Sequence, residues 1–317
     1  MALDLTGLSN YVKENEQQLA TSLVFKPKTA TLIESAGNVM VGVKSSEKIN
    51  IMATDAVFQA GGTCGFSSSG TTAFTQRAVT PGKIKINESI CPKTFEAKYT
   101  QKALRAGSTY DYMPFADEYT SKKIDVIGAA LETALWQGDT ASGNAQLSRF
   151  DGLLKLIAPA GVPVAGVIDG NPGNVASLTT STIIAAVDEV YTLIPASIVA
   201  NGDVVIFAGM DAFRMYTVAL KEANLFHYAA DAVDFEIVLP GTNVKLIAVN
   251  GLNGTDKLIA TRLSNLYLGV DLLNEEERFE LFYAKEADEM RFVSEFKMGV
   301  NYAFPTEIVY WQEGGVA

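Results

Sequence analysis

The closing fifty residues of the chain carry its clearest alternation of apolar and charged positions. Apolar side chains fall two apart through residues 279–284 and again through 290–303, which is the spacing of β-strands that bury one face. We expect two long strands there, exposed on their other face. No catalytic constellation lies along them, so the pattern favours a protein that assembles over one that reacts.

Residues 117–136 show a helical periodicity, because apolar side chains recur three or four positions apart from Ile124 to Leu135. Asp117 is a suitable N-cap and Gly138 a suitable C-terminal stop. The pattern predicts a helix of about twenty residues, roughly 30 Å long. Such a helix would be a spine on which other elements lie.

A compact module is predicted for residues 180–251. Its elements follow in the order helix, strand, helix and hairpin, at 183–194, 204–208, 211–220 and 235–249. Pro195 stops the first helix, and Pro240-Gly241 supplies the hairpin turn. This mixture of helices and strands predicts an α+β fold.

The segment 59–92 is the most irregular part of the chain. It contains the run GGTCGFSSSGTT, then a turn signal at 80–82, then strict alternation from Lys83 to Asn87. We predict two long strands joined by a mobile tip, which together form a loop projecting from the body. The glycines lack the motifs of phosphate-binding loops, so no nucleotide site is expected.

The first 35 residues are predicted to form a polar arm, with a short helical stretch near 8–19. Pro27 interrupts any helix there, so the rest of the arm is expected to be extended. Two short apolar strands follow at 39–43 and 49–53.

Charge is unevenly distributed along the chain. The net charge of the 317 residues is −11, yet residues 1–110 contain 12 Lys/Arg and only 8 Asp/Glu. One interpretation is that surface charge merely drifts along the sequence. The other is that the basic front of one copy lies against the acidic back of another.

Candidate catalytic and metal-binding residues are few. His227 is the single histidine, which excludes a Ser-His-Asp triad and histidine-rich metal sites. The acidic run Glu275-Glu276-Glu277 is interpreted as a solvated or partner-facing surface, and a soluble α+β enzyme that uses these carboxylates is the alternative. We expect no catalytic residue, no cofactor and no metal. The apolar runs are too short to cross a membrane.

The order of these parts resembles the major capsid protein of tailed bacteriophages, whose Hong Kong 97-type fold is shared with encapsulins. The resemblance spans nearly the whole chain. It is carried by the arm, the segment 59–92, the helix with ALETALWQGD and the downstream FDGLLKLI, the module with DVVIFAGMDAFRMYTVAL, and the closing EMRFVSEFKMGVNYAFPTEIVYW.

This resemblance implies an N-terminal arm, an extended β-hairpin loop, a long spine helix, a peripheral domain and an axial domain. The implied divisions are arm 1–35, peripheral-domain strands 36–58, extended loop 59–92, peripheral domain 93–179 with spine helix 117–136, axial domain 180–251, and peripheral-domain strands with the C-terminus 252–317.

A function is implied as well. The chain would form the hexamers and pentamers of an icosahedral shell around phage double-stranded DNA, without sequence-specific contacts to that DNA. A separate scaffolding protein, a portal and decoration proteins would be its partners. Its location would be the virion capsid, assembled in the host bacterial cytoplasm. An encapsulin-like compartment that encloses a cargo enzyme is the alternative.

On this resemblance the extended loop reaches over a neighbouring subunit. Basic residues on the loop are then predicted to meet the acidic run of that neighbour, pairing Arg77, Lys83 and Lys85 with Glu275, Glu276 and Glu277. Charge reversal at Lys83 and Lys85 is expected to impair assembly.

Overall fold

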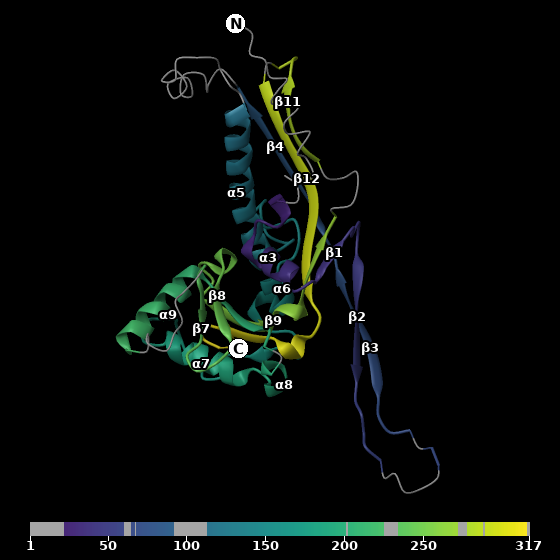
Figure 1. Ribbon diagram of the computed structural model, residues 1–317, viewed down its shortest axis with the longest axis vertical. Helices are drawn as coiled ribbons and strands as arrows, with labels where there is room; N and C mark the ends of the chain where they lie inside the picture. The colour runs from purple at the N-terminus through teal and green to yellow at the C-terminus, as the bar shows by residue number, and fades with distance from the viewer. Residues whose placement is uncertain are drawn as a thin grey trace.

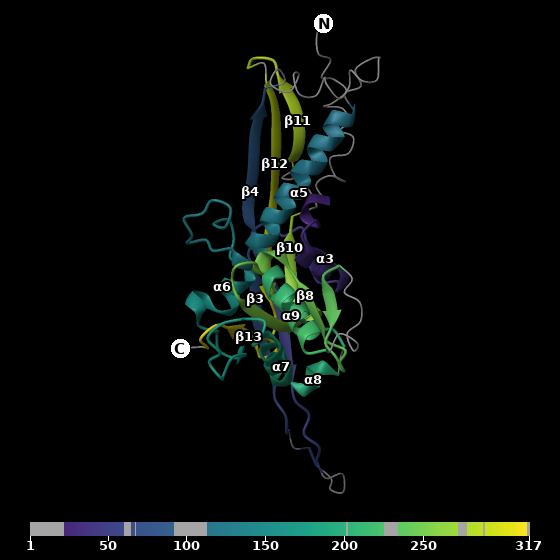
Figure 2. The same cartoon turned by 90° about the vertical axis from the view of Figure 1, so that its left-hand side faces the viewer.

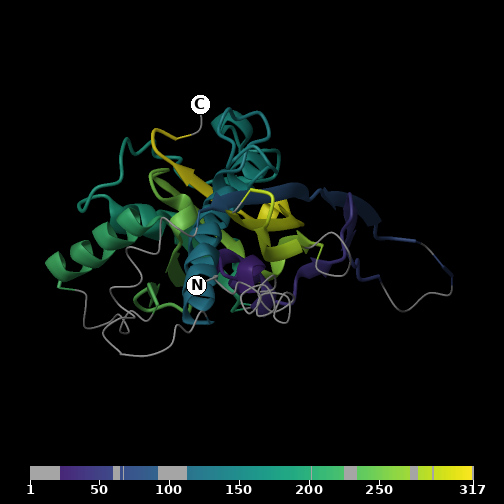
Figure 3. The same ribbon diagram turned by 90° about the horizontal axis from the view of Figure 1, so that it is seen from above.

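The computed structural model describes residues 22–59, 65, 66, 68–91, 113–200, 202–224, 234–271, 278–287 and 289–315, without the side chains of 113–118, 278 and 279. The molecule is elongated (Figure 1). A long helix and a long sheet form its upper half, a helical module lies at the lower left, and a two-stranded hairpin extends downward on the other side. Seen from above, the module and the hairpin project to opposite sides of the long helix (Figure 3).

The long sheet confirms the strands predicted near the C-terminus. Its strands are β1 (Val39–Val41), β10 (Leu266–Val270), β12 (Glu289–Tyr302) and β11 (Arg278–Ala284) in that order, with β4 (Gly82–Ile90) also paired to β12. The expectation that β12 is exposed on one face is wrong for its second half, where every residue from Phe296 to Tyr302 is buried. Strands on both of its edges and packing from other elements cover this half, which no local pattern could indicate.

The spine helix is α5 (Met113–Gln137), which begins four residues before the predicted start. Asp117 therefore lies inside the helix and is not its N-cap. Pro114 does not prevent the earlier start, because proline is tolerated in the first turn of a helix. The predicted end is confirmed, since the Gly138 amide donates a hydrogen bond to the Ala134 carbonyl at 2.9 Å.

A second sheet of six strands organises the lower module. Its order is β5 (Ile168–Asp169), β13 (Val309–Gln312), β9 (Lys257–Arg262), β6 (Val204–Ala208), β8 (Lys245–Ala248) and β7 (Glu236–Val238). The helices α7 (Ile183–Leu193) and α9 (Met210–Glu222) pack on it, and α8 (Ala196–Val199) is short. The predicted order of helix, strand, helix and hairpin is confirmed. Strands β9 and β13, from the segment 252–317, complete the sheet of this module.

Strand β6 is the central element of the six-stranded sheet and is buried on both faces. Val204, Ile206 and Ala208 contact the helices of the module. Val205 and Phe207 face the other core, in which α5 lies. This explains why the sequence of β6 is continuously apolar and does not alternate.

The projecting hairpin consists of β2 (Glu47–Thr54) and β3 (Thr72–Val79), paired from Glu47↔Val79 to Thr54↔Thr72. This corrects the prediction that residues 59–92 form the loop. Strand β4 does not pair with β3; it turns back along β12 in the body. Both strands within 59–92 have partners outside that segment: β3 pairs with the preceding strand β2, and β4 pairs with β12, which is distant in sequence.

The first described residues also differ from the predicted arm. A packed helix, α3 (Lys28–Ser35), follows Pro27 directly and buries Thr29, Ala30 and Ile33. Pro27 starts this helix because its φ of −60° suits the N-cap. The predicted helical stretch at 8–19 lies outside the described residues.

The remaining helices are short. They are α6 (Leu153–Ile157) and the 3₁₀ turns η2 (Pro159–Gly161), η3 (Asn250–Leu252), η4 (Leu263–Asn265) and η5 (Pro305–Glu307). Figure 2 shows α6 beside the lower end of α5, and both helices contribute buried residues to the same core.

Candidate assembly surfaces

The described part of the chain has no group of three or more His, Cys, Asp or Glu residues that could hold a metal ion. No helix in that part is long and apolar enough to span a membrane. His227 lies outside the described residues. Two surface features stand out in the described part of the chain: the projecting hairpin and a groove beside α5.

The projecting hairpin exposes apolar side chains away from the body. At its base, Ile49 and Ile51 are buried in a small cluster with Val79 and Ala303. Further out, the cross-strand pair Met52 and Phe74 is 58% and 74% exposed. At the tip, Phe58 and Phe66 are 99% and 96% exposed.

Arg77 lies at the base of this hairpin on β3. Its guanidinium carbon is 4.2 Å from the centre of the Tyr302 ring, a cation–π contact within the same chain. Arg77 therefore helps to fix the hairpin to the long sheet. Its predicted contact with a neighbour's acidic run stays a prediction.

Lys83 and Lys85 lie on β4 in the body, so their predicted place on the projecting loop is wrong. Lys85 forms an ion pair of 2.5 Å with Glu295, directly across from it on β12. Lys83 lies across from Lys297 and has no ion-pair partner among the described residues. Glu275, Glu276 and Glu277 lie outside the described residues, so their pairing with these lysines stays a prediction.

A groove of about 600 Å³ separates the middle of α5 from β4. Its floor is apolar and includes Ile84, Ile86, Val126, Ala130 and Leu131. Its rim is cationic, with Lys83, Lys85, Lys123 and Arg149.

Contacts towards the two ends of α5 fix the position of this helix beside the groove. Near one end, the Tyr119 hydroxyl donates to Glu88 at 3.0 Å, and Lys123 forms an ion pair with the same carboxylate. The hydrogen bond from Lys123 is the main reason that the pKa of Glu88 is lowered. Near the other end, the Trp136 ring packs on Phe207 with centroids 5.0 Å apart.

A buried polar cluster joins α3 to α5. Glu132 accepts hydrogen bonds from the Thr29 amide at 3.0 Å and the Thr29 hydroxyl at 2.5 Å. The Trp136 indole donates to the same hydroxyl at 2.7 Å. Burial raises the pKa of Glu132 above its usual value, although the bonds from Thr29 oppose this. The cluster fixes the position of the spine helix.

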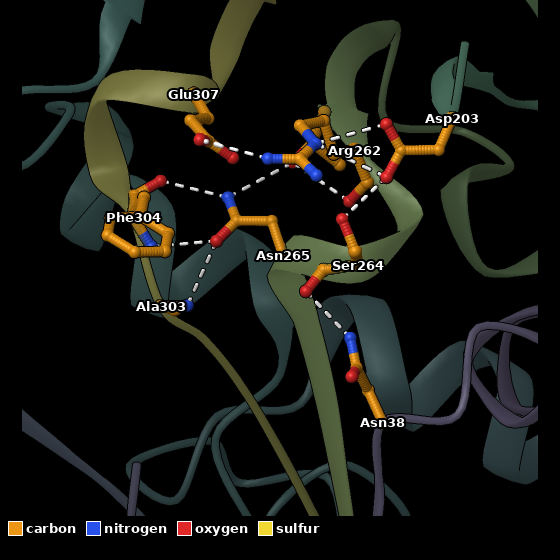
Figure 4. Close-up of polar contacts among 9 residues, drawn as sticks. Asn38, Asp203, Arg262, Ser264, Asn265, Ala303, Phe304 and Glu307 are labelled. Carbon is orange, nitrogen blue, oxygen red and sulfur yellow. Dashed lines mark hydrogen bonds and ion pairs between the residues drawn. The ribbon is translucent and has the colours of Figure 1, made fainter. Parts of the chain in front are cut away.

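The two sheets are joined at the turn η4, between β9 and β10 (Figure 4). Arg262 donates to both oxygens of Asp203, at 3.0 and 3.2 Å, and to Glu307 at 3.4 Å. Asn265 accepts hydrogen bonds from the amides of Ala303 and Phe304, at 3.1 and 2.7 Å. These contacts set the angle between the long sheet and the lower module.

A second polar anchor lies where the hairpin leaves the body. Lys297 is buried and forms an ion pair of 3.2 Å with buried Asp271. The same ammonium donates to the Lys44 carbonyl at 3.2 Å, just before β2 begins. The sequence analysis did not single out Lys297. Its position within the apolar second half of β12 was the signal that could have indicated a buried cation.

Comparison with known proteins gives results only at the level of structure. No family model matches the sequence, and no curated protein matches it. A chain of the satellite phage P4 procapsid, a structure that includes the size determination protein, matches with a TM-score of 0.56 and 15% identity, over 94% of this chain and 97% of that one. A chain of the cyanophage A-1(L) capsid matches with a TM-score of 0.57 and 13% identity, over 90% and 92%.

The chain has the Hong Kong 97-type capsid fold. A structure from Microbacterium phage Oxtober96 matches as well, with a TM-score of 0.50 and 16% identity over 89% of this chain and 90% of that one. Each likeness covers nearly the full length of both chains, so it includes the long sheet and the lower module together.

Proposed function

We propose that this chain is a major capsid protein of a tailed bacteriophage, which assembles into an icosahedral shell around double-stranded DNA. The observation that carries the proposal is the likeness to phage capsid chains over nearly the entire length of both partners. Fold alone does not fix function, so the surfaces of the chain must also suit assembly.

Those surfaces support the proposal. The hairpin β2–β3 carries apolar side chains into solvent far from either core, and such exposed apolar residues are typical of interaction sites. A contact between a projecting element and a different surface on the next copy is heterologous, and heterologous contacts form closed rings when the rotation between neighbouring copies closes. Rings of five and six copies are the units that the proposed shell requires.

The proposed role is structural, without a catalytic step. Proposed partners are further copies of the chain in hexamers and pentamers, a separate scaffolding protein, a portal, decoration proteins and the packaged DNA. The proposed location is the virion capsid, after assembly in the cytoplasm of the host bacterium.

The first experiment is the particle size of the purified chain, measured by light scattering and negative-stain electron microscopy. We expect closed shells tens of nanometres across. A stable monomer at high protein concentration would remove the main support for spontaneous assembly and make the alternative of a soluble enzyme worth testing. Shells that enclose a cargo enzyme, and protect no DNA in infected cells, would favour an encapsulin-like compartment instead.

A further inference from the structure

Glu132 is a buried carboxylic acid at the interface between α3 and the spine helix α5. It is only 3% exposed and has no ion-pair partner among the described residues. Its two oxygens instead accept from the Thr29 hydroxyl at 2.5 Å and the Thr29 amide at 3.0 Å. An ionised carboxylate in a protein interior is strongly disfavoured unless a cation compensates it. The charge state of Glu132 therefore bears on how firmly α3 is held.

The charged groups around this interface are engaged elsewhere. Lys28 on α3 is the cation that acts on Glu132, but only through its distant field. Its ammonium pairs with Glu236 on β7 at 3.5 Å and donates to the Asp234 carbonyl at 2.6 Å. Lys26, just before α3, pairs with Asp125, about two turns before Glu132 on α5. The turn η3 and the strand β6, which pack beside the interface, contain no titratable residue.

Both contacts of Glu132 with Thr29 survive when the carboxyl is protonated. The hydrogen in the 2.5 Å contact can be carried by either oxygen, so a neutral Glu132 donates to the Thr29 hydroxyl while its second oxygen still accepts from the Thr29 amide. The neutral form keeps these bonds without a buried charge, whereas the ionised form keeps them with one. Burial therefore raises the pKa of Glu132, and the opposing bonds from Thr29 do not outweigh it.

The helix α3 joins two parts of the molecule. Thr29, Ala30 and Ile33 are buried against the core that contains α5. From the same helix, Lys28 reaches β7 at the edge of the six-stranded sheet. A change in how firmly Thr29 is held on α5 is therefore transmitted to the contact between the spine helix and the lower module.

We propose that Glu132 is a proton-controlled latch for α3. The protonated carboxyl holds the first turn of α3 closed on the spine helix. Ionisation places an uncompensated charge in the interface, and water enters to solvate it, which loosens that turn. This inference goes beyond the proposed function and concerns a single subunit.

The direction of the pH dependence follows from the raised pKa of Glu132. A group whose pKa is higher in the folded state stabilises the fold fully below its unfolded value, which is about 4.3 for glutamate. That contribution is lost as the pH rises through the pKa of the folded state. The latch is therefore closed in mild acid and weakened at higher pH.

Trp136 offers a direct optical readout of the latch. Its indole donates to the Thr29 hydroxyl at 2.7 Å, so its surroundings change with the proton on Glu132. The chain has two tryptophans. The other, Trp311, is buried and its indole nitrogen has no hydrogen-bond partner among the described residues, so Trp311→Phe breaks no hydrogen bond there. The fluorescence of that variant reports on Trp136 alone.

The first test is a pH titration of this fluorescence in the full chain with Trp311→Phe, with circular dichroism at each pH to confirm that the fold is retained. We expect a single step with a midpoint above the ordinary glutamate value of about 4.3. Adding Glu132→Gln, which mimics the protonated carboxyl, should abolish the step. Adding Asp125→Asn is the matched control, because it removes an exposed carboxylate from the same helix and should leave the step in place.

The second test measures hydrogen exchange of the α3 amides by mass spectrometry. Wild type and Glu132→Gln are compared at the same pH, so that the intrinsic pH dependence of exchange cancels. We expect equal rates below the fluorescence midpoint and severalfold faster exchange of wild-type α3 above it, because only the wild type acquires the buried charge.

Three results would overturn the latch. They are a Trp136 titration without a step or with a midpoint at or below the ordinary value, a step that persists in Glu132→Gln, and equal exchange of α3 in both proteins at every pH. The titration leaves the cluster itself intact, so a missing step counts against the latch even if Glu132→Gln does not fold. Particle formation is not measured in either test, and the proposed function is therefore judged separately.

Discussion

At the scale of single residues, a few partly buried polar side chains decide how the two sheets meet. Arg262 leaves the six-stranded sheet at the end of β9 and joins Asp203, before β6, to Glu307, after β12. Ser264 donates a hydrogen bond of 2.5 Å to the same aspartate, and Asn38 donates to the Ser264 carbonyl at 2.6 Å. Four segments distant in sequence are thereby connected through the turn that contains Arg262 and Ser264.

We predict that Arg262→Met destabilises the fold by about 1–3 kcal/mol, because it leaves Asp203 and Glu307 partly buried without their shared cation. Chemical denaturation measures this loss. Arg214→Met is the matched control, since its ion pair with Asp211 is exposed on α9, and exposed pairs contribute about 0–1 kcal/mol. Equal losses from the two variants would contradict the role given to Arg262.

The effect of Arg262→Met is expected to depend on pH. Burial alone would raise the pKa of Asp203, but hydrogen bonds from Ser264 and Arg262 outweigh it and lower the pKa. A lowered pKa stabilises the fold above the unfolded value of about 3.9, and this contribution is lost as the pH falls. The difference between wild type and variant should therefore be largest near neutral pH and shrink below about pH 4.

At the scale of elements, the spine helix depends on a close approach that only glycine permits. Gly251 in η3 lies against α5, where an added Cβ would overlap the Trp136 ring and the Glu132 carbonyl oxygen. Gln137 fixes the same approach by donating to the Gly251 carbonyl at 2.7 Å. The turn η3 thus joins the lower module to the helix that borders the groove.

We predict that Gly251→Ala lowers stability by about 1–3 kcal/mol, as expected for overpacking of a tight contact. The melting temperature should fall by several degrees. Gly143→Ala is the control, because no heavy atom lies within 4 Å of its added Cβ. A Gly251 variant as stable as the Gly143 variant would show that η3 moves away from α5 without cost.

At the scale of the whole molecule, the uneven distribution of charge along the sequence has two explanations: a drift in surface charge, or contacts between the basic front of one copy and the acidic back of another. The positions of the individual lysines bear on this choice. Lys85 neutralises Glu295 within its own sheet, so this basic residue is accounted for inside one subunit. Lys83, three positions along the groove wall from Ile86, has no such partner among the described residues. A charge contact between subunits on this strand would therefore use Lys83.

We predict that Lys85→Glu and Lys83→Glu act differently. The first places two glutamates directly opposite each other on β4 and β12, which costs about 0.2–1 kcal/mol and lowers the melting temperature. The second replaces a like-charge pair with Lys297 by an opposite-charge pair, so it should not lower the melting temperature, and it should reduce particle formation, most clearly at low salt. Lys221→Glu on α9 controls for net charge. Particles from the Lys83 variant at wild-type yield would contradict an inter-subunit role for this residue.

Sequence by itself determined the elements whose signal is local. The heptad-like spacing from Ile124 to Leu135 specified the spine helix, and alternation specified β11 and β12. The continuous apolar run at 204–208 predicted a buried strand, because a strand with one face in water would carry polar side chains at alternate positions. The order of these elements was sufficient for the resemblance to the Hong Kong 97-type fold that the structure bears out.

Tertiary structure decided which strands pair and which surfaces stay open. Strand β4 alternates strictly, but this pattern does not indicate its partner: β3 pairs with β2 in the hairpin, and β4 pairs with β12 in the body. Pairing depends on hydrogen bonds between segments far apart in sequence, which a local pattern does not encode. The groove beside α5 and the isolated tip aromatics follow from the same pairings, so the candidate site could be recognised only once the chain was folded.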